Sequence, residues 1–296
     1  MIGTLARRGV PLLWEHYASE RKRPLAATPF TPDPARWPDT GLHAAWLGHS
    51  TVLLKMDGVT ILTDPVFSRR IGLNLGPLTI GLKRLVEPAL PLRATPRPDL
   101  VLLSHAHMDH FDLPSLRALE SAKTHVVTAS KTSDLLRVRR YRRVDELGWG
   151  ESTQVGDARV RAFEVKHWGA RMQSDTWRGF NGYLIETPRY RVVFGGDTAM
   201  TRTFRELRAS RNSRRLDLAI MPIGAYNPWI RAHCTPEEAL QMANDAGAEF
   251  ILPVHHQTFP LSREPRREPI ERLYSALSGT PERLAWQEIG QEIRLF

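Results

Sequence analysis

The 296-residue sequence contains little cysteine and no long apolar run. Its one cysteine, Cys234, has no partner within the chain, so the fold does not depend on an intrachain disulfide or on an oxidising compartment. A catalytic thiol at this position is less favoured than an inert small residue. No stretch is long enough to cross a bilayer, and the N-terminus lacks the apolar stretch and cleavage site of a signal peptide. We therefore expect a cytoplasmic protein.

Acidic residues are outnumbered in the sequence. Lys and Arg number 41 against 32 Asp and Glu, which gives a net charge of +9. A basic excess favours anionic partners such as phosphate esters, acidic membrane surfaces or nucleic acids. Because no DNA- or RNA-binding motif accompanies the charge, we expect no nucleic-acid partner. A basic surface that only keeps the protein soluble would also account for the charge.

The N-terminal part of the chain differs from the rest. Residues 1–17 carry Leu5, Leu12, Leu13 and Trp14, and could form a helix lying on an anionic membrane, at the inner membrane surface. A helix packed on its own domain fits the same residues equally well. Residues 24–40 are proline-rich and are expected to be mostly irregular. We therefore divide the chain into an N-terminal extension (residues 1–40) and one domain (residues 41–296), since no linker interrupts the latter.

Short strand patterns dominate the domain. The strongest is a hairpin about Asp57-Gly58, a dipeptide typical of two-residue turns. Further strands are expected at 43–48, 100–105, 124–129, 152–156, 158–168, 180–187, 190–198, 216–224, 249–256 and 291–296. Helices are expected at 113–120, 131–140, 235–247 and 267–278, the third with Thr235 as N-cap, Pro236 in its first turn and Gly247 at its end. Hairpins followed by strands that alternate with helices indicate an α/β (α+β) fold of two mixed sheets with helices outside.

Residues 65–98 do not fit this pattern. They are rich in Pro, Gly and Leu, and we expect them to be irregular. An apolar loop of this length is uncommon in a compact domain and usually has a function, such as a lid or a flap that contacts substrate. The apolar loop 71–92 could therefore receive acyl chains or contact a membrane.

The stretch Ser-His-Ala-His-Met-Asp-His, residues 104–110, carries the densest set of metal-binding side chains. It follows an apolar run that is typical of a buried strand. Imidazole and carboxylate are ligands of zinc and its neighbours. His105 and His107 are two residues apart and can point to one spot in extended chain, while Asp109 and His110 can point to a second. A solvated polar loop is the simpler alternative, but the density of the motif favours metal.

More candidate ligands lie at the ends of predicted strands further along the chain. His167 ends one strand pattern, Asp197 ends another, and His255 and His256 end a third. Ligands at the ends of several strands can converge on one site at the edge of a sheet. Each of them alone could be a capping or core residue. Together with the motif at 104–110 they favour a metal site.

These motifs resemble the metallo-β-lactamase superfamily, whose pattern is HxHxDH with distant His, Asp and His ligands. Within it, the sequence is most similar to the branch of N-acyl-phosphatidylethanolamine-hydrolysing phospholipase D-like proteins. The matching stretches, which span about residues 41–260, are "WLGHSTVLLKMDGVTILTDPVFS", "LVLLSHAHMDHFD", "FGGDT", "MPIGAYNP", "HCTPEEAL" and "ILPVHHQTF". The resemblance implies an αββα sandwich and makes residues 41–296 a hydrolase domain.

The resemblance also implies roles for single residues. It implies seven metal ligands: His105, His107 and His167 for the first zinc, Asp109, His110 and His255 for the second, and Asp197 between the two. His256 stands where the family usually has tryptophan. Asp109 and His233 are the candidate catalytic residues, and His233 would position substrate or stabilise the transition state, although a structural role is equally compatible. His49 and Asp64 lie in family motifs, where we expect them to support the site or the fold, and His43 and His125 are expected to be ordinary strand histidines.

Seven ligands are too many for one tetrahedral zinc. They suit two ions about 3.5–4 Å apart that share a bridging hydroxide, which would be a nucleophile near neutral pH. We therefore predict two Zn²⁺ ions, with Mn²⁺ or Fe as alternatives. Such a centre attacks phosphorus and carbonyl carbon alike, so it predicts hydrolysis without defining the substrate.

The resemblance and the basic charge together favour a phosphodiesterase of phospholipase D type. Its substrate would be N-acyl phosphatidylethanolamine or a related small-molecule or phospholipid phosphodiester, reached through peripheral contact with an anionic membrane. Two alternatives remain at this stage. One is a lactonase acting on a sugar lactone or phosphosugar lactone. The other is a metal-stabilised binding protein without catalysis, which is disfavoured because a structural site would be closed and would have no need of Asp109.

Overall fold

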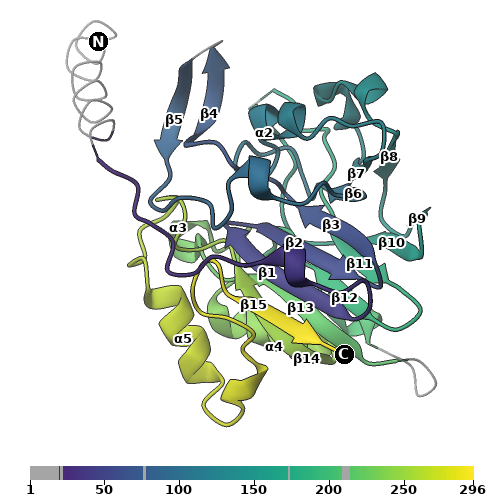
Figure 1. Ribbon diagram of the computed structural model, residues 1–296. Helices are drawn as coiled ribbons and strands as arrows, with labels where there is room; N and C mark the ends of the chain where they lie inside the picture. Colours follow the sequence, from purple (N-terminus) through teal and green to yellow (C-terminus); the bar gives the residue numbers. More distant parts are fainter. Residues whose placement is uncertain (1–19, 21–22, 76–77, 173, 209–213) are drawn as a thin grey trace, which may run out of the picture.

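The structure is a computed structural model that describes residue 20 and residues 23–75, 78–172, 174–208 and 214–296. The N-terminal segment proposed for membrane contact lies outside the described residues. Residues 23–40 are mostly irregular, as expected, with one 3₁₀ turn, η1 (Pro34–Arg36). Two sheets make up the body of the molecule, and a two-stranded hairpin extends away from them (Figure 1).

In the part of the chain that the structure describes, the first sheet has seven strands in the order β15-β1-β2-β3-β6-β7-β8. These are β1 (Leu42–Gly48), β2 (Thr51–Met56), β3 (Val59–Thr63), β6 (Leu100–Leu102), β7 (His125–Ala129), β8 (Arg143–Leu147) and β15 (Glu292–Leu295). Neighbouring strands are antiparallel from β15 through β1 and β2 to β3. They are parallel from β3 through β6 and β7 to β8. The hairpin at Asp57-Gly58 is confirmed, since both residues have the positive φ angles (48° and 88°) that its tight turn requires.

The second sheet, again counted over the described residues, has six strands in the order β14-β13-β12-β11-β10-β9. These are β9 (Ser152–Val155), β10 (Ala158–Phe163), β11 (Gly182–Glu186), β12 (Arg191–Phe194), β13 (Leu216–Pro222) and β14 (Ala248–Val254). The strands from β12 to β14 pair in parallel, and those from β9 to β12 are antiparallel. The predicted pair of mixed sheets is therefore confirmed. β8 was not predicted, because its charged sequence Arg-Val-Asp-Glu-Leu hides the strand pattern.

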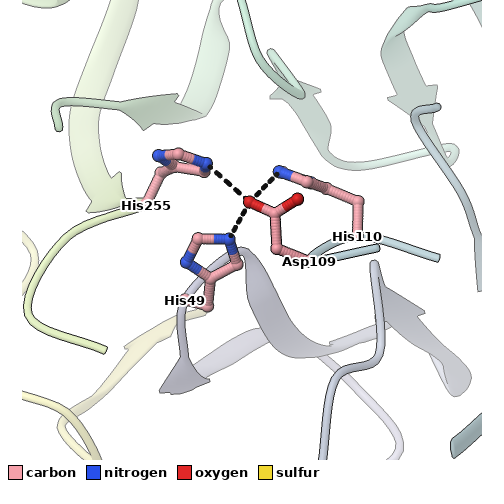
Figure 2. A group of neighbouring side chains, drawn as sticks. All are labelled: His49, Asp109, His110 and His255. Carbon is pink, nitrogen blue, oxygen red and sulfur yellow. Dashed lines mark hydrogen bonds and ion pairs between the residues drawn. The ribbon is translucent and has the colours of Figure 1, made fainter. Parts of the chain in front are cut away.

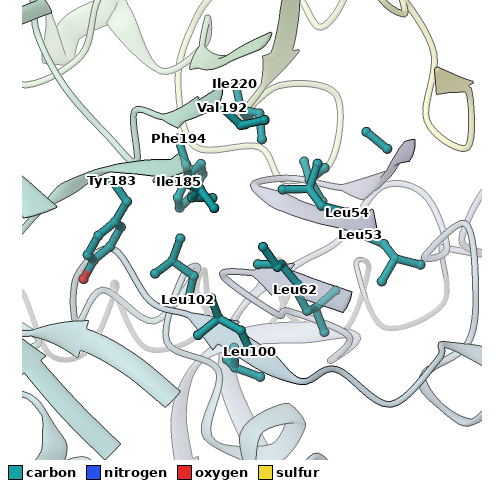
Figure 3. Packing of buried hydrophobic residues seen from close by; sticks show 14 of the residues in the cluster. Leu53, Leu54, Leu62, Leu100, Leu102, Tyr183, Ile185, Val192, Phe194 and Ile220 are labelled. Atoms are coloured by element: carbon teal, nitrogen blue, oxygen red, sulfur yellow. The ribbon is translucent and has the colours of Figure 1, made fainter. Parts of the chain in front are cut away.

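The core lies between the two sheets. Figure 3 shows Leu54 and Leu102 of the first sheet facing Ile185 and Phe194 of the second. Successive residues of the second sheet alternate between this core and its other face, so the sheet is buried on both sides. Full burial of one such side chain contributes about 1.5–3 kcal/mol. The core therefore fixes the strands, and with them the position of the residues that follow each strand.

Two helices cover the outer face of the second sheet. Among the described residues the α-helices are α2 (Leu113–Ala118), α3 (Tyr226–Trp229), α4 (Pro236–Ala246) and α5 (Glu268–Ala276). The apolar faces of α4 and α5 pack on that sheet. The predicted boundaries of α4 are confirmed, because Thr235 and Glu238 form a reciprocal cap at its start and Gly247 ends it at a φ of 75°. No helix among the described residues is long and apolar enough to span a membrane.

The prediction of a helix at residues 131–140 is wrong. The segment instead forms two 3₁₀ turns, η3 (Ser133–Leu135) and η4 (Val138–Arg140). The carboxylate of Glu146 accepts hydrogen bonds from the backbone N–H groups of Lys131, Thr132 and Ser133. Because β8 carries Glu146, tertiary contact overrides the helical pattern here. The remaining 3₁₀ turns are η2 (Leu92–Ala94), η5 (Thr203–Leu207) and η6 (Pro281–Arg283).

The prediction of an irregular loop at residues 65–98 is also partly wrong. The segment contains the antiparallel hairpin of β4 (Arg70–Leu75) and β5 (Leu78–Lys83). Gly72 and Gly81 face each other across it, and a Cβ atom at either position would lie 2.0 Å from a carbonyl oxygen of the other strand. The glycines therefore allow two backbones to approach closely, although their presence in the sequence predicts a loop. Leu73 and Ile80, also paired, remain about half exposed.

Candidate metal centre

The predicted site residues follow strands that run in the same direction. The 104–110 motif follows β6, His167 follows β10, Asp197 follows β12 and His255 follows β14. The ends of these strands meet at one edge of the sandwich. Fixed strands at a shared edge bring distant segments of the chain together without long-range flexibility.

The first cluster consists of His105, His107 and His167. The Nε2 atom of His105 lies 2.8 Å from Nδ1 of His107, and that Nδ1 atom lies 3.3 Å from Nε2 of His167. Three nitrogens from two separate segments therefore face one another, within the range over which they could bind one ion.

The second cluster consists of the predicted ligands Asp109, His110 and His255, and His49 lies within ligand distance of the same group (Figure 2). The Oδ2 atom of Asp109 lies 3.6 Å from Nε2 of His110 and 3.5 Å from Nε2 of His255. His49 contacts the same oxygen, with its Nε2 atom 3.1 Å away. A carboxylate and two imidazoles thus converge, with a third imidazole beside them.

Asp197 lies between the two clusters. Its Oδ2 atom is 3.1 Å from Nε2 of His110 and of His255, 3.8 Å from Nε2 of His167 and 4.0 Å from Nε2 of His105. One carboxylate oxygen therefore faces predicted ligands of both clusters. The preceding Gly196 has a φ of 57°, and a Cβ atom there would lie 2.8 Å from that of Ser104. Glycine at this position lets the Asp197 segment approach the motif after β6.

Hydrogen bonds on the outer side of the rings orient the histidines. Nδ1 of His167 lies 2.9 Å from the carbonyl oxygen of Ala232, and Nδ1 of His110 lies 2.7 Å from Oδ2 of Asp64. A carbonyl oxygen and an ionised carboxylate oxygen can only accept a hydrogen bond, so each Nδ1 carries the hydrogen and donates it. In the neutral ring, Nε2 then has a lone pair that faces inward. Tautomers set in this way are typical of metal-binding histidines.

His105 is oriented through Ser104. The hydroxyl of Ser104 donates to Oδ2 of Asp64 at 2.5 Å, and Nδ1 of His105 lies 2.8 Å from that hydroxyl oxygen. A hydroxyl has one hydrogen to give, so Nδ1 of His105 donates to it and Nε2 presents a lone pair. Asp64, which is fully buried, therefore orients His110 directly and His105 through Ser104. It contacts both clusters.

Charge is distributed unevenly in the site. Burial lowers the pKa of His167 to about 3 and holds the pKa of His105 well below its usual range, so the first cluster is neutral. Burial alone would raise the pKa of Asp197, but neighbouring histidines, His110 first, hold it well below its usual value. Burial alone would lower the pKa of His255, but Asp197 outweighs it and raises that pKa to about 9. The buried carboxylates thus require positive charge beside them.

The donor set fits metal ions. Nε2 of His110, Nε2 of His255 and Oδ1 of Asp197 are buried and have no hydrogen bond of good geometry to the described residues. A buried polar atom without a partner costs about 1–3 kcal/mol. Cations bound between the clusters would give these atoms a partner and balance the negative charge of the carboxylates. Imidazole nitrogen with carboxylate oxygen is a donor set that zinc, iron and manganese accept.

Strained backbone is concentrated around the site. Several residues other than glycine have positive φ angles, and four of them border the clusters: His49 (52°), Asp64 (32°), Ala225 (64°) and His255 (63°). Each such residue costs about 1–3 kcal/mol and persists only where the surrounding structure holds it. Their concentration here indicates a functional site.

All seven predicted ligands come together, and His233 joins them. Its Nδ1 atom lies 3.9 Å from Oδ2 of Asp197, and burial lowers its pKa to about 4. His255 contacts both aspartates, whereas His256 turns away and stacks on Trp46 with ring centroids 4.6 Å apart. The structure therefore places His255 and not His256 in the site.

The other predicted histidines lie apart from the site. His43 contacts the carbonyl oxygen of Thr40, and His125 contacts Asp145, which agrees with the expectation for strand histidines. Cys234 is buried and its thiol donates to the carbonyl oxygen of Pro222, and burial raises its pKa. The thiol is thus protonated and held inside the protein.

Sequence reasoning missed two contacts that support the motif. Ser104 was not singled out, although it precedes His105 directly. The guanidinium of Arg171 donates to the carbonyl oxygens of Ala106 and Phe111, which closes the loop carrying the ligands at both ends. A serine adjoining the motif could have signalled the first contact, but nothing in the sequence around Arg171 marks the second.

A cavity of about 240 Å³ opens over the clusters. His107, Asp109, Asp197, His233 and His255 supply its polar wall. Trp168, Trp229 and Leu261 also line it, and the two tryptophans are 43% and 52% exposed. The metal centre is thus open to solvent on one side, next to exposed aromatic surface. An open position is typical of catalytic rather than structural metal sites.

Comparisons with known proteins identify the family of the chain. A family model described as "Beta-lactamase superfamily domain" matches residues 59–256. An uncharacterized protein of Mycobacterium tuberculosis is 34% identical over 92% of this chain and 75% of its own length. The N-acyl-phosphatidylethanolamine-hydrolyzing phospholipase D 1 of Caenorhabditis elegans is 30% identical over 79% of this chain and 69% of its own length.

Solved structures share the fold. A metallo hydrolase of the hyperthermophilic archaeon Ignicoccus hospitalis superposes with a TM-score of 0.63. The alignment covers 87% of this chain and 99% of that protein at 20% sequence identity. At this identity the likeness concerns the fold alone, and it agrees with the predicted αββα arrangement.

Proposed function

Since the chain belongs to the beta-lactamase superfamily of metal-dependent hydrolases, and within it to the branch of N-acyl-phosphatidylethanolamine-hydrolysing phospholipase D-like proteins, we propose that it is a dinuclear phosphodiesterase. The observation that carries this proposal is the position of Asp197, whose Oδ2 atom faces both clusters. A carboxylate that faces both clusters suits a two-metal site.

In this proposal the residues of the first cluster would hold one ion, those of the second would hold the other, and Asp197 would be available to both. When bound, the ions would act as Lewis acids that lower the pKa of water and balance charge on the substrate. Zinc is the expected metal, with manganese or iron as alternatives. The chain's own contribution is orientation, because Ala232, Ser104 and Asp64 fix which ring nitrogens face inward.

His233 is the proposed substrate-contacting residue. It lines the cavity, and its Nδ1 atom is buried without a hydrogen bond to the described residues. A neutral imidazole donates one hydrogen bond, which suits an oxygen of a phosphodiester as charge develops on it. Asp109, in the second cluster, combines metal binding with a place on the cavity wall, where it would orient the attacking water.

The surroundings of the cavity favour a lipid phosphodiester. Trp168 and Trp229 at the cavity offer apolar surface beside the polar wall. The β4–β5 hairpin, which extends away from the sheets within the segment 71–92 proposed to receive acyl chains, carries the exposed apolar side chains of Leu73 and Ile80. The net charge of +9 favours an anionic substrate or surface. N-acyl phosphatidylethanolamine combines acyl chains with a phosphodiester, and we propose it, or a related phosphodiester, as substrate.

The proposed cellular setting follows from that substrate. We propose a cytoplasmic protein that reaches the inner membrane surface peripherally. Basic side chains near an anionic leaflet contribute about 1 kcal/mol each, so weak and salt-sensitive contact would be enough to deliver substrate.

A side-by-side assay tests the proposed reaction. Zinc-loaded protein is given vesicles of N-acyl phosphatidylethanolamine, a small activated phosphodiester and a set of lactones. We expect hydrolysis of both phosphodiesters and none of the lactones. Hydrolysis of lactones alone would replace the proposal with a lactonase, and no hydrolysis of any substrate by fully loaded protein would favour a binding protein.

A further inference from the structure

His49 is a buried histidine beside the second cluster that is not among the seven predicted ligands. It is 1% exposed and lies in the turn between β1 and β2, far in sequence from the residues it contacts. Its Nε2 atom is 3.1 Å from Oδ2 of Asp109. Because the ionised carboxylate can only accept, Nε2 carries the hydrogen and donates to Asp109.

The backbone of His49 is held at three points. Its N–H donates to the hydroxyl of Thr258 at 2.7 Å, and its carbonyl accepts from the indole N–H of Trp46 at 2.7 Å. The same carbonyl accepts from the backbone N–H of His255 at 3.1 Å. These bonds fix a non-glycine residue at a φ of 52°, a conformation that requires such support. His49 is therefore a rigid donor.

The ring of His49 is also fixed by packing. Its centroid lies 4.3 Å from that of His255 and 5.2 Å from that of His110, and Phe259 packs edge-on at 5.2 Å. Figure 2 shows His49, His110 and His255 grouped around one oxygen of Asp109. His49 thus contacts all three members of the second cluster, and within the described part of the chain it has no hydrogen bond or ring contact with the first.

Asp109 is the member of the second cluster that most needs support. It lies in the turn after His107, and its side chain is 15% exposed, against 0% for His110 and 1% for His255. A carboxylate on a turn can rotate about its terminal torsion unless one oxygen is held. A donor at 3.1 Å holds Oδ2 toward the two imidazoles.

We propose that His49 is a positioning residue for the second ion: it holds Asp109 by its side chain and His255 by its backbone, so that the occupancy of the second ion, but not of the first, depends on it. This inference rests on the dinuclear site of the proposed function. Residues that orient metal ligands typically change metal affinity by about 10–100-fold when replaced.

The test compares two substitutions by the number of zinc ions bound per chain at a series of buffered free zinc concentrations. His49→Leu removes the donor and keeps an apolar side chain in the packed position. His49→Gln keeps an N–H group that can reach toward Asp109. We expect His49→Leu to weaken the binding of one of the two ions by about 10–100-fold and to leave the other unchanged, and His49→Gln to recover most of that loss.

His43→Leu serves as the matched control. His43 is also a buried histidine of the β1 region, but it contacts the carbonyl oxygen of Thr40 rather than the site. We expect this variant to bind both ions as the wild type does. If His49→Leu does not fold, judged by the circular dichroism of the metal-free protein, His49→Asn replaces it, because asparagine is too short to reach Asp109.

Three results would overturn the inference. Equal weakening of both steps in His49→Leu would mean a general structural role. Loss of the second ion in His49→Gln as well would mean that the imidazole itself is needed, as for a ligand. Full binding by both variants would mean that His49 does not matter for metal.

Failure of the proposed function can be distinguished from failure of the inference on His49. A wild-type protein that binds two ions but hydrolyses no phosphodiester would refute the proposed reaction. The inference on His49 would then still be decided by the zinc titration of its variants. A wild-type protein that binds one ion at saturating zinc would contradict both.

Discussion

The two clusters of the metal centre are built differently. The first cluster has three neutral histidines, and its outer contacts are a backbone carbonyl for His167 and a hydroxyl for His105. The second cluster includes a carboxylate, and the side chains of Asp64 and His49 contact it from outside. The first is therefore oriented by one distant backbone carbonyl and one adjacent hydroxyl, and the second by the side chains of two residues distant in sequence. Two residues, Asp197 and Asp64, join them.

The largest effect is expected from Asp197→Ala, which removes the shared carboxylate. Because Oδ2 of Asp197 faces both clusters, both ions should be lost and activity should fall to the level of the metal-free protein. Metal content and hydrolysis of a small phosphodiester check this. Asp217→Ala, at the start of β13 away from the clusters, is the control. Retention of both ions and activity would mean that the clusters are independent.

His233→Ala should separate metal binding from catalysis. His233 lies on the cavity wall and belongs to neither cluster, so we expect both ions to remain. Loss of a donor that stabilises charge in the transition state typically costs about 10²–10³-fold in kcat. Metal content together with kcat and KM for a small phosphodiester checks this. A loss of one ion would show instead that His233 is a ligand.

Asp64→Asn should weaken both clusters together. Asp64 accepts from the backbone N–H and hydroxyl of Ser104 and from Nδ1 of His110, and an amide offers one acceptor oxygen in place of two. We expect a loss of about 10–100-fold in zinc affinity at both steps, measured by competition with a chelator. Asp145→Asn is a matched control, since Asp145 also holds a histidine, His125, outside the site. A loss confined to one step would contradict the link between the clusters.

The smallest effect is expected from Ser104→Ala. The change removes the hydroxyl that accepts from Nδ1 of His105 but leaves His110 in contact with Asp64. The first step of zinc binding should weaken by about 10-fold and the second should be unchanged. Ser121→Ala, at a buried serine away from the site, is the control. Weakening of the second step in the same titration would show that the clusters share more than Asp197 and Asp64.

The same contrast explains what could be predicted from sequence. The spacing of His105, His107, Asp109 and His110 is local, so a short motif was enough to predict convergence, and the distant ligands were found because they follow strands. The support of the second cluster is not local. The family motifs predicted that His49 and Asp64 support the site or the fold, but not which ligand each contacts, because these hydrogen bonds join residues 46–60 positions apart in sequence.

Errors in the fold prediction have the same origin. The β4–β5 hairpin was taken as a loop because its glycines disguise the alternation of apolar residues, and their use is visible only when two backbones meet. No α-helix forms at 131–140, because backbone N–H groups at the start of this segment donate to the carboxylate of Glu146. Glu146 lies on β8, a strand that the sequence pattern did not predict. The buried strands of both sheets were predicted well, since burial on two faces leaves a strong apolar pattern.

The most direct test of the account is the metal content of the wild-type protein. Metal-free protein is reconstituted with zinc, freed of excess metal and analysed for zinc and for protein by independent methods. Two clusters that share Asp197 predict two zinc ions per chain, bound in two steps. One ion per chain at saturation, or none, would contradict the account.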